Sequence, residues 1–287
     1  MDSRPSPTSN TGPTWSKLGL GTGTLASLGR AASVSQVEQL IGAMLDLGIT
    51  VIDTADSYGS GDCEILLGKV LRVRRSSFTL VTKAGYRLSN LGGPLRPLNQ
   101  FVKKGFQRLG LNQRFEPAYL KKCLDKSLSR LKMDHVDVFL LHDPPLETVT
   151  SDGVLHLCRD FVKSGKAHLV GVSSGDPVVL RQAIASGVFE VIQTPANLGA
   201  ASALRPLWQE CEASRIHVIG NHVFSPQCLA IPGMTHEKLM RGSAALLPVN
   251  STILCGSRNP SHLRETNGWA HNPMPEVEAE HLAEILL

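Results

Sequence analysis

The feature that most constrains the fold is an alternation of short apolar runs with amphipathic stretches, repeated along almost the whole chain. The apolar runs predict strands at 18–23, 50–53, 78–82, 136–141, 168–172, 191–194, 217–220 and 252–254. Apolar residues at helical spacing between them predict helices at 33–47, 63–71, 117–133, 153–163, 178–186, 204–214, 236–246 and 260–267, and a helical tail at 277–287.

This alternation predicts an α/β fold. The strand runs are rich in β-branched residues and almost continuously apolar, as in buried parallel strands. About eight strand–helix pairs within roughly 250 residues favour a closed (β/α)8 TIM barrel, whose active site lies at the C-terminal rim. A doubly wound open sheet is the alternative, which the absence of an early GxGxxG turn weakens.

The chain divides unevenly. Residues 1–16 are rich in Ser, Pro, Thr and Asn without an apolar core, which predicts a flexible leader rather than a secretory signal. We expect residues 17–287 to form a single barrel domain. A long stretch at about 84–116, containing LGGPLRPL and KKGFQRLG, separates the third strand from its helix. We expect this loop to lie beside the mouth of the site.

Composition excludes several classes of protein. Hydrophobic residues make up 42% of the chain, yet no apolar run reaches membrane-spanning length. The net charge is +4, but the basic residues are scattered and aromatics are 5%, which argues against nucleic-acid binding. The six cysteines lack disulfide or zinc-finger spacing, as in a cytoplasmic protein with reduced core thiols. We expect a monomer or small homo-oligomer that acts on small molecules.

Polar residues end the predicted strands two to seven, which is where a barrel enzyme places its chemistry. These residues are Asp53, Lys83, His142, Ser173, Gln193 and Asn221. Tyr58 follows Asp53 in the loop that starts the next helix. Each residue alone is weak evidence, since an isolated Asp often caps a helix and an isolated His often only packs. Together they predict an acid, a phenol, an ammonium and an imidazole on one rim.

The four groups make a coherent acid–base site. A phenol with a pKa near 10 is a poor acid at neutral pH, and the Lys83 ammonium is expected to lower that pKa. Asp53 would hold Lys83 in place, and His142 would orient a substrate oxygen. A metal site is disfavoured here, because Asp53, His142 and Asp143 are the only candidate ligands and no second His ends a matching strand.

The motifs DTADSYG, LVTKAG, LLHDP, GVSS and GSRNP resemble those of the aldo-keto reductases, from LGLGTGTL to SRNPSHLRE. The resemblance implies hydride transfer between a nicotinamide cofactor and an aldehyde or ketone, or the reverse oxidation of an alcohol or sugar. It assigns the catalytic roles to Asp53, Tyr58, Lys83 and His142, with Tyr58 as general acid–base.

The cofactor motifs match less completely. The resemblance implies cofactor contacts at Gly23, Thr24, Ser173, Ser174, Gln193, Asn221, Ser257, Arg258, Asn259, His262 and Glu265. Three positions depart from the family pattern: Ser174 stands for Asn, Gly256 for Lys and His262 for Arg. Ser257 and Arg258 at a helix start favour NADPH, with NADH possible.

The substrate remains open at this level. Only about a dozen residues join strand seven to the helix near His236, and the chain stops soon after 277–287, so two usual substrate walls are short. The pocket is expected to be open, or completed by the 84–116 loop or a partner subunit. None of Trp15, Trp208 and Trp269 is placed to form an aromatic cage. Alternatives are a catalytically weak nicotinamide-binding regulatory subunit, and a hydrolase or aldolase that uses Lys83 as a Schiff base.

Overall fold

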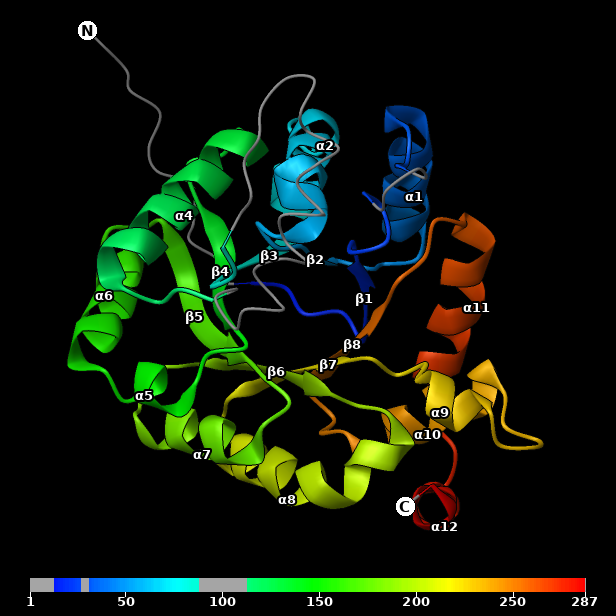
Figure 1. Cartoon of the computed structure of the whole chain (residues 1–287). Helices are drawn as coiled ribbons and strands as arrows, with labels where there is room; N and C mark the ends of the chain where they lie inside the picture. Colours follow the sequence, from blue (N-terminus) through cyan, green and yellow to red (C-terminus); the bar gives the residue numbers. More distant parts are fainter. Residues whose placement is uncertain (1–12, 27–30, 88–112, 287) are drawn as a thin grey trace, which may run out of the picture.

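The strands form a closed, all-parallel barrel. The computed structural model describes residues 13–26, 31–87 and 113–286, so most of the predicted 1–16 leader and of the 84–116 loop lies outside the described residues. Each strand pairs with its neighbours in sequence, and β8 closes on β1 (Figure 1). The strands are β1 (Leu18–Gly21), β2 (Val51–Asp53), β3 (Thr79–Ala84), β4 (Val136–His142), β5 (Ala167–Ser173), β6 (Val191–Pro195), β7 (His217–Asn221) and β8 (Ser251–Cys255).

Helices surround the barrel and cover its outer face (Figure 1). They are α1 (Val34–Asp46), α2 (Asp62–Val70), α4 (Pro117–Leu131), α5 (Leu146–Val149), α6 (Asp152–Lys163), α7 (Pro177–Ala185), α8 (Leu198–Ala213), α9 (Pro226–Leu229), α10 (His236–Leu246), α11 (Pro260–His271) and α12 (Glu276–Ile285). Two 3₁₀ turns, η1 (Tyr58–Gly61) and η2 (Arg75–Ser77), lie in the loops after β2 and before β3. The predicted (β/α)8 barrel is therefore confirmed.

The main departure from the predicted elements is α8, which begins six residues before the predicted start at Leu204. The side chain of Asn197 caps it by accepting a hydrogen bond from Ala200 N at 3.1 Å. The small residues that follow Asn197 give little apolar periodicity, so the first turns of α8 were not predicted. The short helices α5 and α9 were not predicted, because four residues contain little more than one helical turn and so show no repeating pattern.

The core has two layers. A small cluster of strand residues fills the barrel interior, formed by Val51, Val81, Val138, Leu140, Val191, Ile219 and Leu254. Trp15 packs against this cluster and stacks on His217 of β7, with ring centroids 3.6 Å apart. Because His217 begins its strand, Trp15 closes the N-terminal end of the barrel. The larger layer lies between the strands and the helices.

One close approach inside the sheet requires glycine. A Cβ at Gly171 of β5 would lie 2.0 Å from the Val191 carbonyl oxygen of β6. Any side chain there would push these neighbouring strands apart, since real Cβ contacts are much longer. Gly171 thus lets β5 and β6 run side by side, where Ser173 pairs in register with Gln193.

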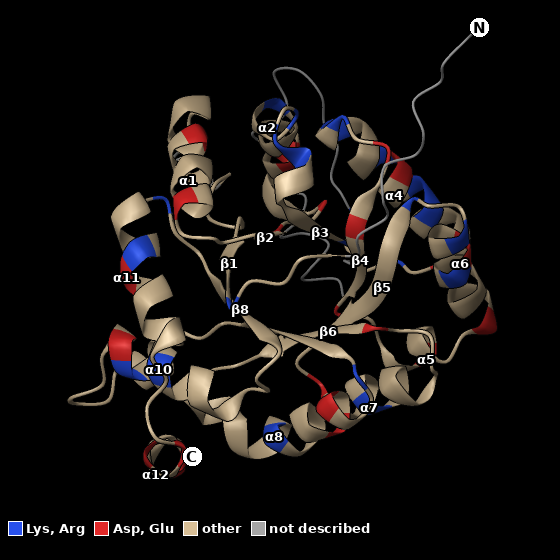
Figure 2. Cartoon of the chain, turned by 180° about the vertical axis from the view of Figure 1, so that it is seen from behind, with Lys and Arg blue, Asp and Glu red and all other residues tan. Residues whose placement is uncertain are grey.

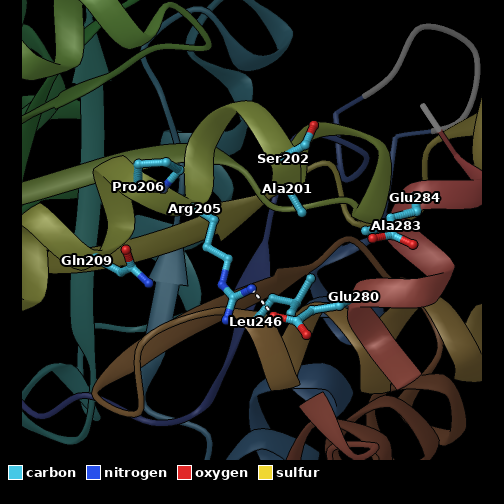
Figure 3. A pocket seen from close by; sticks show the side chains of 9 residues that line it. All are labelled: Ala201, Ser202, Arg205, Pro206, Gln209, Leu246, Glu280, Ala283 and Glu284. Carbon is cyan, nitrogen blue, oxygen red and sulfur yellow. Dashed lines mark hydrogen bonds and ion pairs between the residues drawn. The ribbon is translucent and has the colours of Figure 1, made fainter. Parts of the chain in front are cut away.

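The C-terminal helix α12 is held against α8 by charged contacts. Arg205 of α8 forms ion pairs with Glu276 and Glu280 of α12. Its side chain crosses a cavity of about 530 Å³ between the two helices, toward Glu280 (Figure 3). None of the predicted catalytic residues lines this cavity.

Charge lies mainly on the outer helices. Lys and Arg share α4, α6 and α8 with Asp or Glu, rather than forming a basic stripe (Figure 2). All six cysteines are buried and none forms a disulfide, as predicted. Within the described ranges, every helix is too short or too polar to cross a bilayer.

Candidate active site

Five of the six predicted strand-end residues lie at the carboxyl ends of their strands, whereas Gln193 is the middle residue of β6. Asp53, His142, Ser173 and Asn221 are the last residues of their strands, and Lys83 is the last but one of β3. Register places His142 beside Ser173, and Ser173 beside Gln193. Since all strands are parallel, these side chains share the C-terminal rim.

A buried ion pair forms the base of the site. Lys83 Nζ lies 2.7 Å from both Asp53 carboxylate oxygens and 2.9 Å from the Thr54 carbonyl oxygen. The two side chains are only 1% and 4% exposed. Burial alone would lower the pKa of Lys83, but the Asp53 carboxylate and Tyr58 outweigh it and raise that pKa. Lys83 is therefore a fixed cation at neutral pH.

Tyr58 lies directly beside this cation. Its side chain comes from the 3₁₀ turn η1 after β2, and its hydroxyl lies 3.5 Å from Lys83 Nζ. The ammonium also lies 5.0 Å from the centroid of the phenol ring. Gly23 passes over the ring, since a Cβ there would lie 3.6 Å from it. The predicted contact between phenol and ammonium is present.

The net pKa of Tyr58 differs from the expectation. Lys83 is the largest influence and lowers the pKa, but burial and the Asp53 carboxylate raise it, and together they prevail. The expected influence of Lys83 is present, and the net rise comes first from burial and then from the Asp53 carboxylate. Tyr58 therefore keeps its proton at neutral pH, and Lys83 is placed to stabilise the phenolate that forms when the proton leaves.

His142 flanks the phenol on the other side. The Tyr58 and His142 ring centroids are 6.1 Å apart, edge to face. A third aromatic, Tyr86, packs edge to face on His142 at 4.8 Å and donates a hydrogen bond to Asp143 Oδ2 at 2.7 Å. Sequence reasoning missed Tyr86. Its place three residues after Lys83, just beyond the end of β3, was a usable signal.

Further polar residues extend the ion pair across the rim. Gln193 donates through Nε2 to Asp53 Oδ1 at 2.8 Å, and its Oε1 accepts from Ser173 Oγ at 2.8 Å. Both side chains are almost fully buried. This fixes the orientation of the Gln193 amide and gives Asp53 a second partner. Ser174 accepts from Asp176 N at 3.1 Å, so its hydroxyl orders the turn before α7.

A separate cavity lies at the start of α11. Its volume is about 340 Å³, and it is lined by Phe224, His236, Gly256, Ser257, His262, Glu265, Thr266 and Trp269. Three of the predicted cofactor residues, Ser257, His262 and Glu265, thus share one cavity. Phe224, His236 and Trp269 add aromatic walls to this cavity.

Other predicted cofactor residues have local contacts. Arg258 donates through its guanidinium to the Thr24 carbonyl oxygen, which ties the segment after β8 to the segment after β1. Asn259 caps α11 by accepting from Ser261 N at 3.0 Å. Asn221 Oδ1 lies 2.8 Å from His222 Nδ1 at the end of β7. The observed role of Asn259 is to cap α11.

A second rim cavity lies at the ends of β6 and β7. Its volume is about 770 Å³, and Pro195, Asn197, His222, Phe224, Cys228 and Leu286 are among its lining residues. Phe224 lines both this cavity and the α11 cavity. The short segment after β7 thus connects the two.

Comparisons with known proteins agree with this arrangement. Residues 17–222 match the model of the aldo/keto reductase family. Over 168 residues, 55% of this chain and 47% of the relative, the chain is 33% identical to a 6-dehydroglucose reductase of Novosphingobium aromaticivorans. Over 249 residues, 83% of this chain and 72% of the relative, it is 27% identical to an NADH-specific methylglyoxal reductase of Escherichia coli. The first curated relatives are matched over only about half their length.

Solved structures show the same fold. An aldo-keto reductase from Bacillus halodurans, in its holo form, superposes with a TM-score of 0.71 at 20% identity, covering 94% of this chain and 91% of that one. An aldo/keto reductase from Klebsiella pneumoniae in complex with NADP and acetate gives 0.68 at 19% identity, with 94% and 91% coverage. With the family model covering most of the chain, these findings lead to one conclusion: the chain belongs to the aldo/keto reductase family.

Proposed function

We propose that this chain is an NAD(P)H-dependent oxidoreductase that moves a hydride between nicotinamide and the carbonyl carbon of a small aldehyde or ketone. Tyr58 is the general acid–base. The observation that carries the proposal is the placement of Lys83, which is buried and contacts both the Asp53 carboxylate and the Tyr58 hydroxyl. A lysine that only stabilised the barrel would not need a titratable phenol as its third partner.

The side chains support a simple sequence of proton events in carbonyl reduction. Tyr58 donates its phenolic proton to the carbonyl oxygen as the carbonyl carbon gains a hydride, which yields an alcohol and a phenolate. Lys83 stabilises that phenolate at 3.5 Å, and Asp53 keeps the ammonium charged and in place. His142, whose ring meets that of Tyr58 edge to face, orients the substrate oxygen.

The protonated state of Tyr58 at neutral pH favours one direction of the reaction. A phenol that keeps its proton is ready to donate it, so reduction needs no prior ionisation. Oxidation of an alcohol or sugar needs the phenolate as base, and this form is scarce below the phenol pKa. We therefore propose reduction as the favoured direction at neutral pH.

The residues present fit a nicotinamide dinucleotide. The Gln193 amide and Ser173 hydroxyl lie beside Asp53 and supply donors and acceptors suited to a carboxamide. The cavity at α11 offers the Ser257 hydroxyl, the Glu265 carboxylate and aromatic walls from Phe224 and Trp269, which suit an adenosine. When bound, the reduced cofactor supplies the hydride.

We propose a preference for NADPH over NADH of at least several-fold. Arg258 lies next to Ser257 at the N-terminus of α11, where charge-assisted hydrogen bonds and the helix dipole favour a phosphate. Gly256 stands where the family pattern has a lysine, so the preference for NADPH depends mainly on Arg258 and Ser257. Equal catalytic efficiency with both cofactors would contradict it.

The test is NADPH oxidation with a panel of aldehydes, ketones and sugars, comparing wild type with Tyr58→Phe. Tyr119→Phe is the matched control, because it removes a phenol hydroxyl from α4 instead. We expect Tyr58→Phe to bind NADPH normally, by fluorescence titration, but to lose about 10²–10⁴-fold in turnover. NADPH binding without turnover on any substrate in wild type would indicate a nicotinamide-binding regulatory protein instead, and substantial activity in Tyr58→Phe would refute its role.

A further inference from the structure

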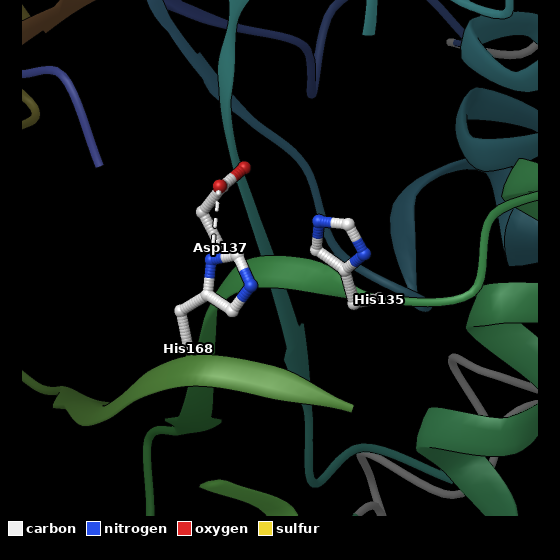
Figure 4. A group of neighbouring side chains, drawn as sticks. All are labelled: His135, Asp137 and His168. Atoms are coloured by element: carbon white, nitrogen blue, oxygen red, sulfur yellow. Dashed lines mark ion pairs between the residues drawn. The ribbon is translucent and has the colours of Figure 1, made fainter. Parts of the chain in front are cut away.

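A cluster of two histidines and one aspartate lies at the N-terminal rim, opposite the proposed active site. His135 precedes β4, Asp137 is the second residue of β4, and His168 is the second residue of β5 (Figure 4). Each offers one ligand atom, and these atoms all lie within 4.8 Å of one another. His142 lies five positions after Asp137 along β4, so the two residues are about 17 Å apart along the strand.

We propose that His135, Asp137 and His168 form a site for a divalent transition-metal ion, with Zn²⁺ as the expected occupant. Two imidazoles and one carboxylate are a ligand set that zinc accepts, with a water as the fourth ligand. The sequence argument missed this cluster because it considered ligands only at the carboxyl ends of the strands.

The register between β4 and β5 brings two of the three proposed ligands side by side. The pairs Val136↔Ala167 and Val138↔Leu169 place Asp137 beside His168 on neighbouring strands. His168 Nδ1 lies 3.5 Å from Asp137 Oδ1. This separation is close to the ~3.3 Å expected between two ligand atoms of a tetrahedral zinc ion with ~2.0–2.1 Å bonds.

The Asp137 carboxylate is also held in the manner of a metal ligand. Its Oδ2 accepts from Leu80 N at 2.7 Å and lies 2.6 Å from Arg75 Nη2. Oδ1, the other oxygen, faces His168. Hydrogen bonds to the second oxygen are the usual means by which proteins orient a ligating carboxylate. The Arg75 charge lowers the affinity for a cation, so we expect moderate rather than very tight binding.

The third ligand, His135, needs a small adjustment. Its ring stacks on that of His168, with centroids 4.5 Å apart and an interplanar angle of 27°. Rotation of the His135 ring, which projects from a loop rather than a strand, brings a nitrogen toward the other two ligands. His168 is 27% exposed, so an ion can enter from solvent.

The test uses metal-depleted full-length protein titrated calorimetrically with Zn²⁺, and with Co²⁺ as a spectroscopic probe. We expect one equivalent to bind, visible absorption of a tetrahedral Co²⁺, and a Tm several degrees higher at a hundredfold excess over Kd. His135→Asn and His168→Asn should each weaken binding at least tenfold. The matched control is His156→Asn, because His156 lies 3.5 Å from Asp160 on the exposed face of α6 without a second imidazole.

Two results would overturn the proposal: no saturable Zn²⁺ binding to wild type, or binding of unchanged affinity in the double variant His135→Asn/His168→Asn. The Co²⁺ spectrum is measured on wild type and does not depend on a variant folding. NADPH oxidation is measured in parallel, and it should be unchanged by the metal because the cluster lies at the opposite rim. The metal site and the proposed function can thus fail separately.

Discussion

Each rim of the barrel carries an ion pair near the sheet, and the pairs differ in what else they contact. At the N-terminal rim, Arg75 forms an ion pair with Asp137 and donates a hydrogen bond to the Phe78 carbonyl oxygen. Leu80 N donates a further hydrogen bond to Asp137 Oδ2. These contacts fasten the turn before β3. At the C-terminal rim, Lys83 meets Asp53 and also a phenol. The difference teaches that the partners of the cation set the proposed acid–base site apart: Arg75 donates to a backbone carbonyl oxygen, whereas Lys83 faces a group that can give up a proton.

The largest effect should come from breaking the Lys83–Asp53 ion pair at the C-terminal rim. Lys83→Met leaves the Asp53 carboxylate buried beside a neutral side chain and the phenolate unsupported. We expect turnover to fall by about 10²–10⁴-fold and stability by about 3–5 kcal/mol. Steady-state kinetics and thermal unfolding measure both. The paired change Arg75→Met should lower stability while leaving turnover per folded molecule near wild type, and a catalytic loss of similar size in that variant would erase the distinction between the rims.

A smaller effect is expected from Gln193→Leu, which removes the second partner of Asp53 and the partner of Ser173. Lys83 remains in place, so the acid–base pair survives but the amide proposed to face the nicotinamide is lost. We expect about a tenfold fall in kcat/KM, consistent with one or two lost hydrogen bonds. Unchanged kinetics, with a loss of stability only, would mean that Gln193 has a structural role and does not contact the cofactor.

Cofactor preference should respond more modestly. Arg258→Gln keeps a polar side chain near Thr24 but removes the cation, and the ratio of kcat/KM for NADPH over NADH should fall by about tenfold or less. Gly256→Lys is the converse change. A Cβ there would make only ordinary contacts, the nearest at 3.6 Å, so the added ammonium should raise the same ratio. If neither substitution moves the ratio, the 2′-phosphate is not recognised at this rim.

The smallest effect on catalysis is expected at the N-terminal rim, where the response is a pH dependence of stability. Burial, with a contribution from Lys17, lowers the pKa of His217 from 6.5 to about 4. The unfolded chain therefore binds the proton more readily, and stability is lost as pH falls from about 6.5 to about 4. We expect a loss of up to about 3 kcal/mol across this range, seen as a lower Tm in acid. His217→Gln should lack this part of the pH dependence, and an identical acid profile in both proteins would count against it.

The barrel and the four proposed catalytic residues could be predicted from the sequence, because both depend on local pattern. Buried parallel strands read as apolar runs, and Asp53, Lys83 and His142 end those runs. The place of Tyr86 just beyond β3 was a signal in the sequence, but its packing on His142 could not be predicted, since that contact depends on how β3 and β4 lie side by side.

The net pKa of Tyr58 also could not be predicted from the sequence. Residue types reveal that an ammonium is near a phenol, but the balance between Lys83, burial and Asp53 depends on distances in three dimensions. The same holds for the His135, Asp137 and His168 cluster, whose members are spread over 34 residues. Register between β4 and β5, rather than spacing in the chain, brings Asp137 and His168 together.

The central claim is that Tyr58 keeps its proton at neutral pH and gives it to the substrate oxygen beside Lys83. The most direct test is the pH dependence of single-turnover hydride transfer in both directions. The pKa of Tyr58 is raised from its ordinary value of 10.0, so the reduction rate should stay flat through neutral pH, while alcohol oxidation should accelerate toward alkaline pH. A reduction rate that falls with an apparent pKa below about 8, or that keeps its size and pH profile in Tyr58→Phe, would contradict the account.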